Sequence, residues 1–126
     1  MNDKKVVNLP GSTPIAPYSP AIIAGDIVYV SGQVGFDPVE RCFYGEDAPA
    51  QMRGMLENLK NVLTQAGSGL EKVIKTTVFL TDVNDFDTFN EIYREYFPKD
   101  PPARSCVQVA ALPKGALIEI EAIALA

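Results

Sequence analysis

Histidine is absent from this chain of 126 residues. Its absence removes the commonest general base and the commonest metal ligand among the side chains. Catalysis by a Ser-His-Asp or Cys-His set is therefore excluded, as is an ordinary zinc site, and we expect no bound metal. Any chemistry has to use arginine, carboxylate, thiol, hydroxyl, amine or backbone groups.

Clustered positive charge and long apolar runs are also missing. The chain has 11 basic and 16 acidic residues, a net charge of −5, and its densest basic groups are Lys4-Lys5 and the separated pair Lys72 and Lys75. Nucleic-acid binding usually needs a clustered basic surface, so we expect none. No segment approaches the run of about 18 apolar residues that spans a membrane, and no apolar stretch follows the first basic residues as in a secretory signal.

The chain has few cysteines and a length that suits one domain. Cys42 and Cys106 lie far apart in the sequence. Without an export signal, they indicate reduced thiols in a cytoplasmic protein. We expect residues 1–126 to form a single domain. A domain this small does not easily enclose a deep cavity, which favours ligand binding at a boundary between subunits.

Hydrophobic spacing predicts two helices. Between Gly45 and Gly67 the apolar residues follow a spacing of three and four without a break. The second helix is expected to begin near Asn84, as its cap, and to end before Pro98. Alternation and turn residues predict the strands. These are a strand near Lys5–Leu9, a hairpin of Ala21–Ala24 and Ile27–Ser31, and strands at Val73–Thr81, Arg104–Val109 and Ala116–Leu125.

The order of these elements indicates an α+β fold: a mixed sheet of about six strands with two helices packed on one face. The last strand tests this. Its apolar side suits the helices, whereas Glu119 and Glu121 alternate with apolar residues on the opposite side. A half-polar face of this kind fits a surface covered by another subunit. The side expected to face the helices consists of Ile118, Ile120, Ala122 and Ala124.

Strand alternation also sorts the residues around Arg104. If Ser105, Val107 and Val109 face the helices, Arg104 and Cys106 share the far face with Glu119. If the last two strands pair as a hairpin, facing side chains lie roughly 5 Å apart. Arg104 is then either one partner of a structural ion pair, with Cys106 as small filler, or a clamp for a ligand carboxylate.

The tract Pro102-Ala103-Arg104-Ser105-Cys106-Val107, followed by Leu112-Pro113 and Ile118-Glu119-Ile120-Glu121-Ala122, resembles the signature of the reactive-intermediate deaminase (Rid) family, and most closely its archetypal deaminase subfamily. The likeness extends over nearly the whole chain. Further matching segments are Ala16-Pro17-Tyr18-Ser19, Val30-Ser31-Gly32-Gln33, Val73–Leu80 and Asn84-Asp85-Phe86. Ala16 stands where glycine is common in the family.

The resemblance implies a chorismate-mutase-like fold and a homotrimer with its sheets toward the centre and three clefts between subunits. It also implies hydrolysis of 2-aminoacrylate and related enamines and imines, the products of pyridoxal-phosphate-dependent dehydratases, to 2-oxo acids and ammonia, without a cofactor. Arg104 would hold the substrate carboxylate, and Glu119 would orient or activate the attacking water. The cleft would be lined by Tyr18, Ser31, Gly32, Asn90 and Cys106.

Two other functions stay open. The same cleft could bind 2-oxo acids or other small carboxylates without catalysis, although a pure binder has no need of Glu119 beside an anion. An endoribonuclease or translation inhibitor is disfavoured by the acidic balance and by the missing acid–base pair. Cys106 is interpreted as a wall of the cleft, because nothing basic adjoins it in the sequence to lower its pKa. Glu121 is left out of the site, since a second carboxylate would repel an anionic ligand.

Overall fold

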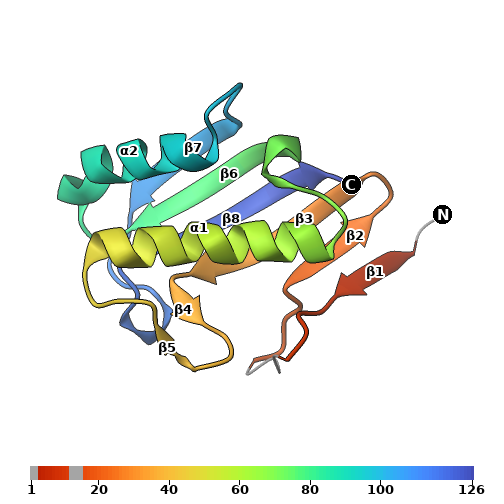
Figure 1. Cartoon of the computed structure of the whole chain (residues 1–126), viewed down its shortest axis with the longest axis horizontal. Helices are drawn as coiled ribbons and strands as arrows, with labels where there is room; N and C mark the ends of the chain where they lie inside the picture. The colour runs from red at the N-terminus through yellow and green to blue at the C-terminus, as the bar shows by residue number, and fades with distance from the viewer. Residues whose placement is uncertain (1–2, 12–15) are drawn as a thin grey trace.

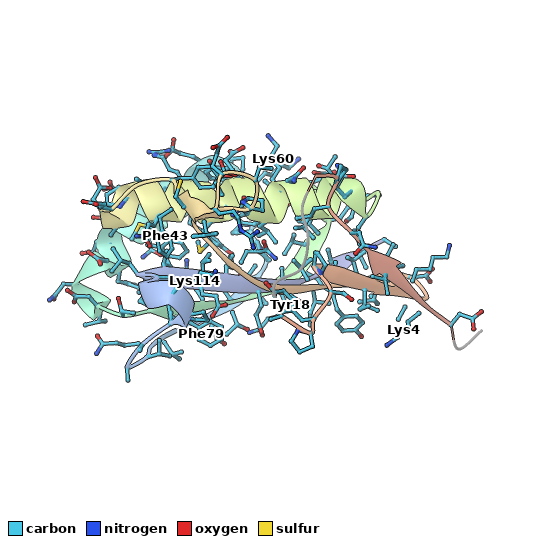
Figure 2. The ribbon with its side chains drawn as sticks, turned by 90° about the horizontal axis from the view of Figure 1, so that it is seen from below. Lys4, Tyr18, Phe43, Lys60, Phe79 and Lys114 are labelled. Atoms are coloured by element: carbon cyan, nitrogen blue, oxygen red, sulfur yellow. The ribbon has the colours of Figure 1, made fainter. Side chains whose placement is uncertain are left out.

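The computed structural model describes residues 3–11 and 16–126. They form two layers, a six-stranded sheet and a pair of helices on one of its faces (Figure 1), which Figure 2 shows from the side. The strand order is β1-β2-β3-β8-β6-β7, with β6 and β7 parallel and the other neighbours antiparallel. The predicted α+β fold with a mixed sheet is therefore confirmed. The strands are β1 Lys4–Val7, β2 Ala21–Ala24, β3 Ile27–Val34, β6 Val73–Leu80, β7 Ala103–Gln108 and β8 Ile118–Leu125.

Helix α1, Ala48–Gln65, lies across the middle of the sheet (Figure 1). The Asp47 side chain caps it by accepting a hydrogen bond of 2.8 Å from the Ala50 backbone N–H. Ala66 caps its C-terminal end, and Gly67 follows with a φ of 79°, a left-handed conformation that glycine adopts without steric cost. The predicted apolar stripe is fully buried at Met52, Met55, Leu56, Leu59, Val62 and Leu63.

Helix α2, Phe86–Tyr96, begins later than predicted. A short 3-10 helix, η2 (Val83–Asp85), precedes it, and Asp82 caps that turn by accepting a hydrogen bond of 2.9 Å from the Asn84 N–H. Asn84 therefore lies inside the turn and does not cap α2. Phe89 and Tyr93 of this helix and Phe97 just after it are buried, and Phe86 is partly buried against them.

The last two strands do not pair as a hairpin, so the condition for close contact between their side chains is not met. β6 lies between β7 and β8 and is hydrogen-bonded to both. The segment β6–α2–β7 is a parallel crossover. In it, α2 carries the chain back to the end of the sheet at which β6 begins, so that β7 can run in the same direction as β6. β7 consequently occupies one edge of the sheet, beside α2, while β8 is central (Figure 1).

A small second sheet, which the sequence did not predict, connects the main sheet to α1. It consists of β4 (Phe36–Asp37) and β5 (Cys42–Phe43). The Asn58 side chain on α1 donates hydrogen bonds of 2.8 Å to the Val34 and Phe36 carbonyls. These bonds hold the end of β3 and the start of β4 against the helix. Two further 3-10 helices, η1 (Leu70–Lys72) and η3 (Pro113–Gly115), precede β6 and β8.

The alternation predicted for the last strand is confirmed. Ile118, Ile120, Ala122 and Ala124 are buried under the helices. Glu121 and Leu125 are exposed on the other face, and Glu119 and Ile123 are half-buried there. The face of the sheet opposite the helices, here called the open face, is thus a mixture of apolar and charged residues. In the described part of the chain, no helix has the length and apolar character to cross a membrane.

Candidate functional site

Arg104 lies on the helix side of β7, against the aromatic residues of α2. Its guanidinium carbon is 4.8 Å from the centre of the Tyr93 ring, 5.5 Å from that of Phe89 and 5.6 Å from that of Phe86. At such distances the ring faces attract the cation. Among residues 3–11 and 16–126 the only ion pair joins Arg53 to Glu95, so no carboxylate neutralises Arg104. The structural ion pair that the sequence left open for Arg104 is therefore not formed among the described residues.

Asn90 and Cys106 lie on the same side of the fold as Arg104. Asn90 and Arg104 line one shallow pocket, together with residues of the loop that precedes β7. Cys106, two residues further along the strand, points the same way and packs against the core. Arg104, Asn90 and Cys106 are called the Arg104 half-site below. The remaining residues of the pocket are Tyr93, Arg94, Phe97, Pro101 and Pro102.

The thiol of Cys106 is not activated. Burial raises the pKa of Cys106 above its usual value, and the nearby Arg104 cation lowers it by a smaller amount. A thiol with a raised pKa carries little thiolate near neutral pH and is a poor nucleophile. A nucleophilic role of Cys106 is therefore disfavoured, and its place in the wall of a cleft stays a prediction.

The expected grouping of Arg104 and Cys106 with Glu119 on one face is wrong. Ser105 and Val107 point to the open face instead, where Ser105 accepts a hydrogen bond of 3.0 Å from Lys75 and Val107 is half exposed. The prediction assumed that the more apolar side of β7 faces the helices. This assumption fails because the aromatic rings of α2 attract a cation and because the open face is itself partly apolar.

Glu119 lies on the open face with Gly32. The register between β3 and β8 shifts between Val30 and Gln33, a bulge that contains Ser31 and Gly32. A Cβ atom on Gly32 would collide with the Glu119 carboxylate, so the carboxylate lies directly over the Gly32 backbone. Because Gly32 has no side chain, the Glu119 carboxylate can occupy this space.

Ser31 ties the loop that carries Tyr18 to the same region. The Ser31 hydroxyl donates a hydrogen bond of 2.6 Å to the Ser19 carbonyl, and the Ser31 N–H donates one of 3.0 Å to the Pro20 carbonyl. Tyr18 is half exposed and lines a pocket with Gly32. Glu119, Gly32, Ser31 and Tyr18 are called the Glu119 half-site below.

The environment of Glu119 favours its protonated form. Partial burial raises the pKa of Glu119 above its usual value, and the negative charge of Glu121 on the same strand raises it further. A carboxyl group with a pKa closer to neutrality exchanges protons more readily with a substrate or water.

The two half-sites are far apart within one chain. Glu119 and Val107 lie opposite the same residue of β6, Phe79, and Arg104 is three residues before Val107 on β7. Two strand spacings of ~4.8 Å and three residues of ~3.3 Å separate the Cα atoms of Arg104 and Glu119 by about 14 Å. Their side chains also point to opposite faces of the sheet. One ligand therefore cannot touch Arg104 and Glu119 of the same chain through short contacts.

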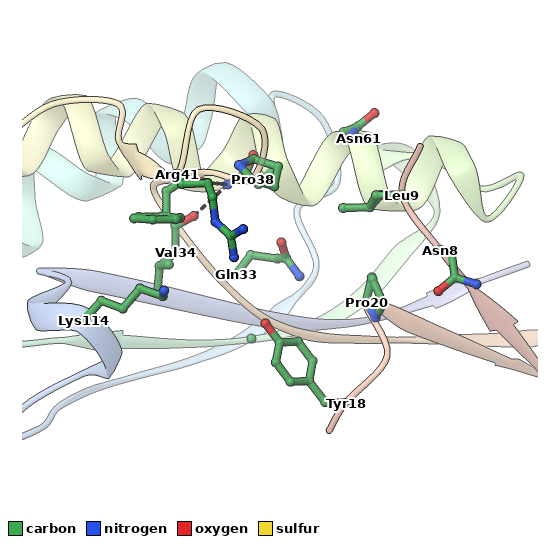
Figure 3. Close-up of a pocket in the computed structure, with 13 residues that line it drawn as sticks. Asn8, Leu9, Tyr18, Pro20, Gln33, Val34, Pro38, Arg41, Asn61 and Lys114 are labelled. Atoms are coloured by element: carbon green, nitrogen blue, oxygen red, sulfur yellow. Dashed lines mark hydrogen bonds between the residues drawn. The ribbon is translucent and has the colours of Figure 1, made fainter. Parts of the chain in front are cut away.

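A second pocket contains two basic residues that the sequence did not single out. Arg41 and Lys114 both line it, together with Gln33 and Tyr18 (Figure 3). Arg41 belongs to the turn between β4 and β5, and Lys114 to η3. No periodic pattern marks either position, so the sequence carried no signal for this pair. Within the described ranges, no three residues of the metal-ligating types histidine, cysteine, aspartate and glutamate are grouped to hold a metal ion.

Comparison with known proteins identifies relatives over nearly the full length. The family described as "Endoribonuclease L-PSP" matches residues 10–126. "RutC family protein UK114" of Drosophila melanogaster is 53% identical over 112 residues, which are 89% of this chain and 81% of that protein. The human "2-iminobutanoate/2-iminopropanoate deaminase" is 46% identical over 111 residues, 88% of this chain and 81% of that protein. The structure of E. coli TdcF with bound serine has a TM-score of 0.91 at 40% identity and covers 97% of this chain and 98% of that one.

Proposed function

We propose that this chain, which belongs to the Rid family, is an enzyme that hydrolyses 2-imino acids to 2-oxo acids and ammonia. Members of this family are also described as RutC or L-PSP proteins. Its substrates are 2-iminopropanoate and 2-iminobutanoate, in equilibrium with their enamines such as 2-aminoacrylate. Such compounds are released by pyridoxal-phosphate-dependent dehydratases, which would supply the substrate. The human relative named for this reaction is the comparison that supports it.

The observation that carries the proposal is the unpaired Arg104 guanidinium. It packs against aromatic rings of α2 and lines a pocket, and no carboxylate of the described chain pairs with it. A planar guanidinium binds a carboxylate through two parallel hydrogen bonds, which fixes the orientation of a 2-imino acid. The serine bound in the E. coli TdcF structure has the same carboxylate next to a carbon that bears nitrogen.

The separation of the half-sites leads to the assembly. Because Arg104 and Glu119 of one chain lie about 14 Å apart on opposite faces of the sheet, we propose that Arg104 of one subunit meets Glu119 of the next. Contacts between two different surfaces of neighbouring subunits form a closed ring when the rotation that relates the subunits returns to the first one. A homotrimer with the open faces inward is such a ring. The half-polar open face would then be covered.

The reaction needs one water and one proton carrier. The substrate carboxylate lies on the Arg104 guanidinium, and the protonated imine nitrogen draws electrons from the adjacent carbon. Glu119 takes a proton from water as the water oxygen bonds to that carbon, and the C=N electron pair moves to nitrogen. Glu119 then returns the proton to nitrogen and takes the proton of the new hydroxyl group as the C–N bond breaks. Ammonia leaves, the C=O bond of the 2-oxo acid forms, and the last proton passes from Glu119 to ammonia or water. Asn90, Cys106, Tyr18 and Ser31 would line the cleft and position the substrate.

The direct test couples the protein to a dehydratase that produces 2-aminoacrylate from serine. We expect the protein to accelerate pyruvate release over the spontaneous rate. Arg104→Ala is expected to remove the acceleration while the oligomer persists, and Lys99→Ala, which removes an exposed cation from the loop before β7, is expected to keep it. Full activity in the Arg104→Ala protein would contradict the assignment of the clamp.

Mixing variants tests whether the site lies between subunits. Arg104→Ala and Glu119→Gln are each expected to be inactive. When they are unfolded and refolded together in equal amounts, about a quarter of the junctions pair an intact Arg104 with an intact Glu119, because each junction draws one half-site from each neighbour. Activity near a quarter of the wild-type value is expected. No recovery in mixed oligomers would contradict a shared site.

The family description also contains the word endoribonuclease. Neither half-site offers the clustered basic surface that RNA binding needs, and the chain has no histidine. We therefore propose imine hydrolysis as the activity and expect no RNA cleavage by the purified protein under conditions in which it releases pyruvate.

A further inference from the structure

The pocket between β3, the β4–β5 hairpin and α1 is lined by two basic residues that belong to neither half-site. Its volume is about 140 Å³, less than the roughly 300–1,000 Å³ of pockets that hold drug-sized ligands. It therefore suits a small metabolite. Its polar side chains include Arg41, Lys114, Gln33 and Tyr18, together with three asparagines, and apolar residues such as Phe36 and Val34 complete the lining. The asparagines are Asn8, Asn58 and Asn61.

Both charged residues in the lining are cations. Among the residues that the structure describes, no aspartate or glutamate lines the pocket. Neither Arg41 nor Lys114 forms an ion pair with a carboxylate in residues 3–11 and 16–126. The nearby Asp37 carboxylate accepts hydrogen bonds from the backbone N–H groups of Val39 and Glu40, at 2.9 and 3.1 Å. In a chain of net charge −5, two unneutralised cations at one pocket form a local site for an anion.

The backbone at both cations is strained. Arg41 has a φ of 62° and Lys114 a φ of 60°, and only one other non-glycine residue of the described chain, Asp100, has a positive φ. A long side chain in this left-handed region costs on the order of 1 kcal/mol, a cost that glycine avoids. Such strain is concentrated at ligand clamps and active sites. Two of the three strained positions supply the two cations of a single pocket.

The pocket wall is held in place before any ligand binds. The Lys114 ammonium lies 4.6 Å from the centre of the Phe36 ring, an attractive cation–π distance. Phe36 in turn packs edge-on against Phe43, with ring centres 5.2 Å apart. The two hydrogen bonds from Asn58 fix the backbone at Val34 and Phe36. A fixed site loses less entropy on binding than a mobile one.

We propose that this pocket binds a small anion, a carboxylate or phosphate group, between the Arg41 guanidinium and the Lys114 ammonium. The guanidinium supplies two parallel donors and the ammonium a point charge, a combination that matches both kinds of anion. The site is separate from the proposed clamp at Arg104, which lies at the β7 edge of the sheet. It shares Tyr18 and Gly32 with the Glu119 half-site, so an anion bound here lies close to the residues proposed to handle water.

Calorimetric titration of the full chain with inorganic phosphate, 2-oxobutanoate and benzoate tests the proposal and distinguishes the two kinds of anion. We expect saturable binding of at least one of them with a Kd of about 1 mM or lower. Arg41→Gly and Lys114→Gly are expected to weaken that binding about tenfold or more. Both variants should fold, because glycine adopts their backbone conformation without strain, and their unfolding temperatures should stay close to that of the wild type.

Two controls separate this site from other effects. Lys99→Ala removes one exposed cation elsewhere and is expected to change the Kd less than twofold. It measures the effect on anion binding of losing one positive charge away from the pocket. Arg104→Ala is expected to leave the binding intact, whereas a ligand in the proposed catalytic cleft would be lost. The proposal is overturned if none of the three anions binds, if Lys99→Ala weakens binding as much as Arg41→Gly, or if Arg104→Ala alone abolishes it.

Discussion

The guanidinium carbon of Arg104 lies 4.8 Å from the centre of the Tyr93 ring, and the Tyr93 hydroxyl is hydrogen-bonded at 2.8 Å to the buried hydroxyl of Thr76. Thr76 and Arg104 are opposite each other on β6 and β7. The ring is thus fixed on one side by the sheet and supports the cation on the other. Burial raises the pKa of Tyr93, so the hydroxyl stays protonated near neutral pH.

Replacing Tyr93 separates these two roles. Tyr93→Leu removes the ring face, and we expect kcat/KM for the imine to fall by about 3- to 30-fold, the range that a partly buried cation–π contact supports. Tyr93→Phe keeps the ring and leaves Thr76 without its partner, so it should lower the free energy of unfolding by about 1 kcal/mol while activity stays within twofold. Coupled pyruvate assays and urea unfolding measure the two effects. Equal activity in the leucine and phenylalanine variants would contradict the role of the ring.

The activity is expected to decline at acidic pH because of Glu119. A general base has to be ionised, and burial together with Glu121 raises the pKa of Glu119, so the decline should be centred above the usual glutamate value of about 4.3. Glu121→Gln removes one of the two causes and should shift the midpoint of kcat/KM to lower pH. Glu71→Gln, on η1, is the matched control and should leave the profile unchanged. An unaltered midpoint in the Glu121→Gln protein would show that Glu119 does not set it.

Gly32→Ala is expected to displace the Glu119 carboxylate, which occupies the place that a Cβ would take. Misplacing a reacting group by about 1 Å costs on the order of 100-fold in rate, and we expect a loss of that size in kcat. The flexible carboxylate can move, so the unfolding temperature should change little. Gly69→Ala provides a close control, because its Cβ would meet the Glu71 carboxylate in the same manner at a distance from both half-sites. Wild-type kcat in the Gly32→Ala protein would argue against Glu119 as the base.

Gly35→Ala is expected to act on stability instead. A Cβ there would collide with the backbone of Gln51 in α1, which cannot move as a side chain can. Crowding of this kind typically costs about 1–3 kcal/mol in the free energy of unfolding. Chemical denaturation measures it, with Gly69→Ala again as the reference. A Gly35→Ala protein as stable as the reference would mean that α1 can shift away from β3.

The sequence predicted α1 and β8 well because each has one buried face with a regular period. The side chain of Arg104 was assigned to the wrong face because β7 is an edge strand whose two faces are both partly exposed, so its alternation carries little information. The pairing of β7 with β6 follows from the crossover through α2, which no local pattern reveals. The Arg41–Lys114 pair depends on contacts such as Asn58 with Val34, between residues 24 positions apart.

The parallel crossover has an evolutionary consequence. It puts the residues that would hold the substrate carboxylate on α2, β7 and the loop between them, while Glu119, which would activate water, belongs to β8. Insertions or substitutions in the 97–102 loop can therefore reshape the substrate pocket without disturbing the hydrolytic residues. In such a scaffold, the substrate preference can change during evolution while the hydrolytic step is retained.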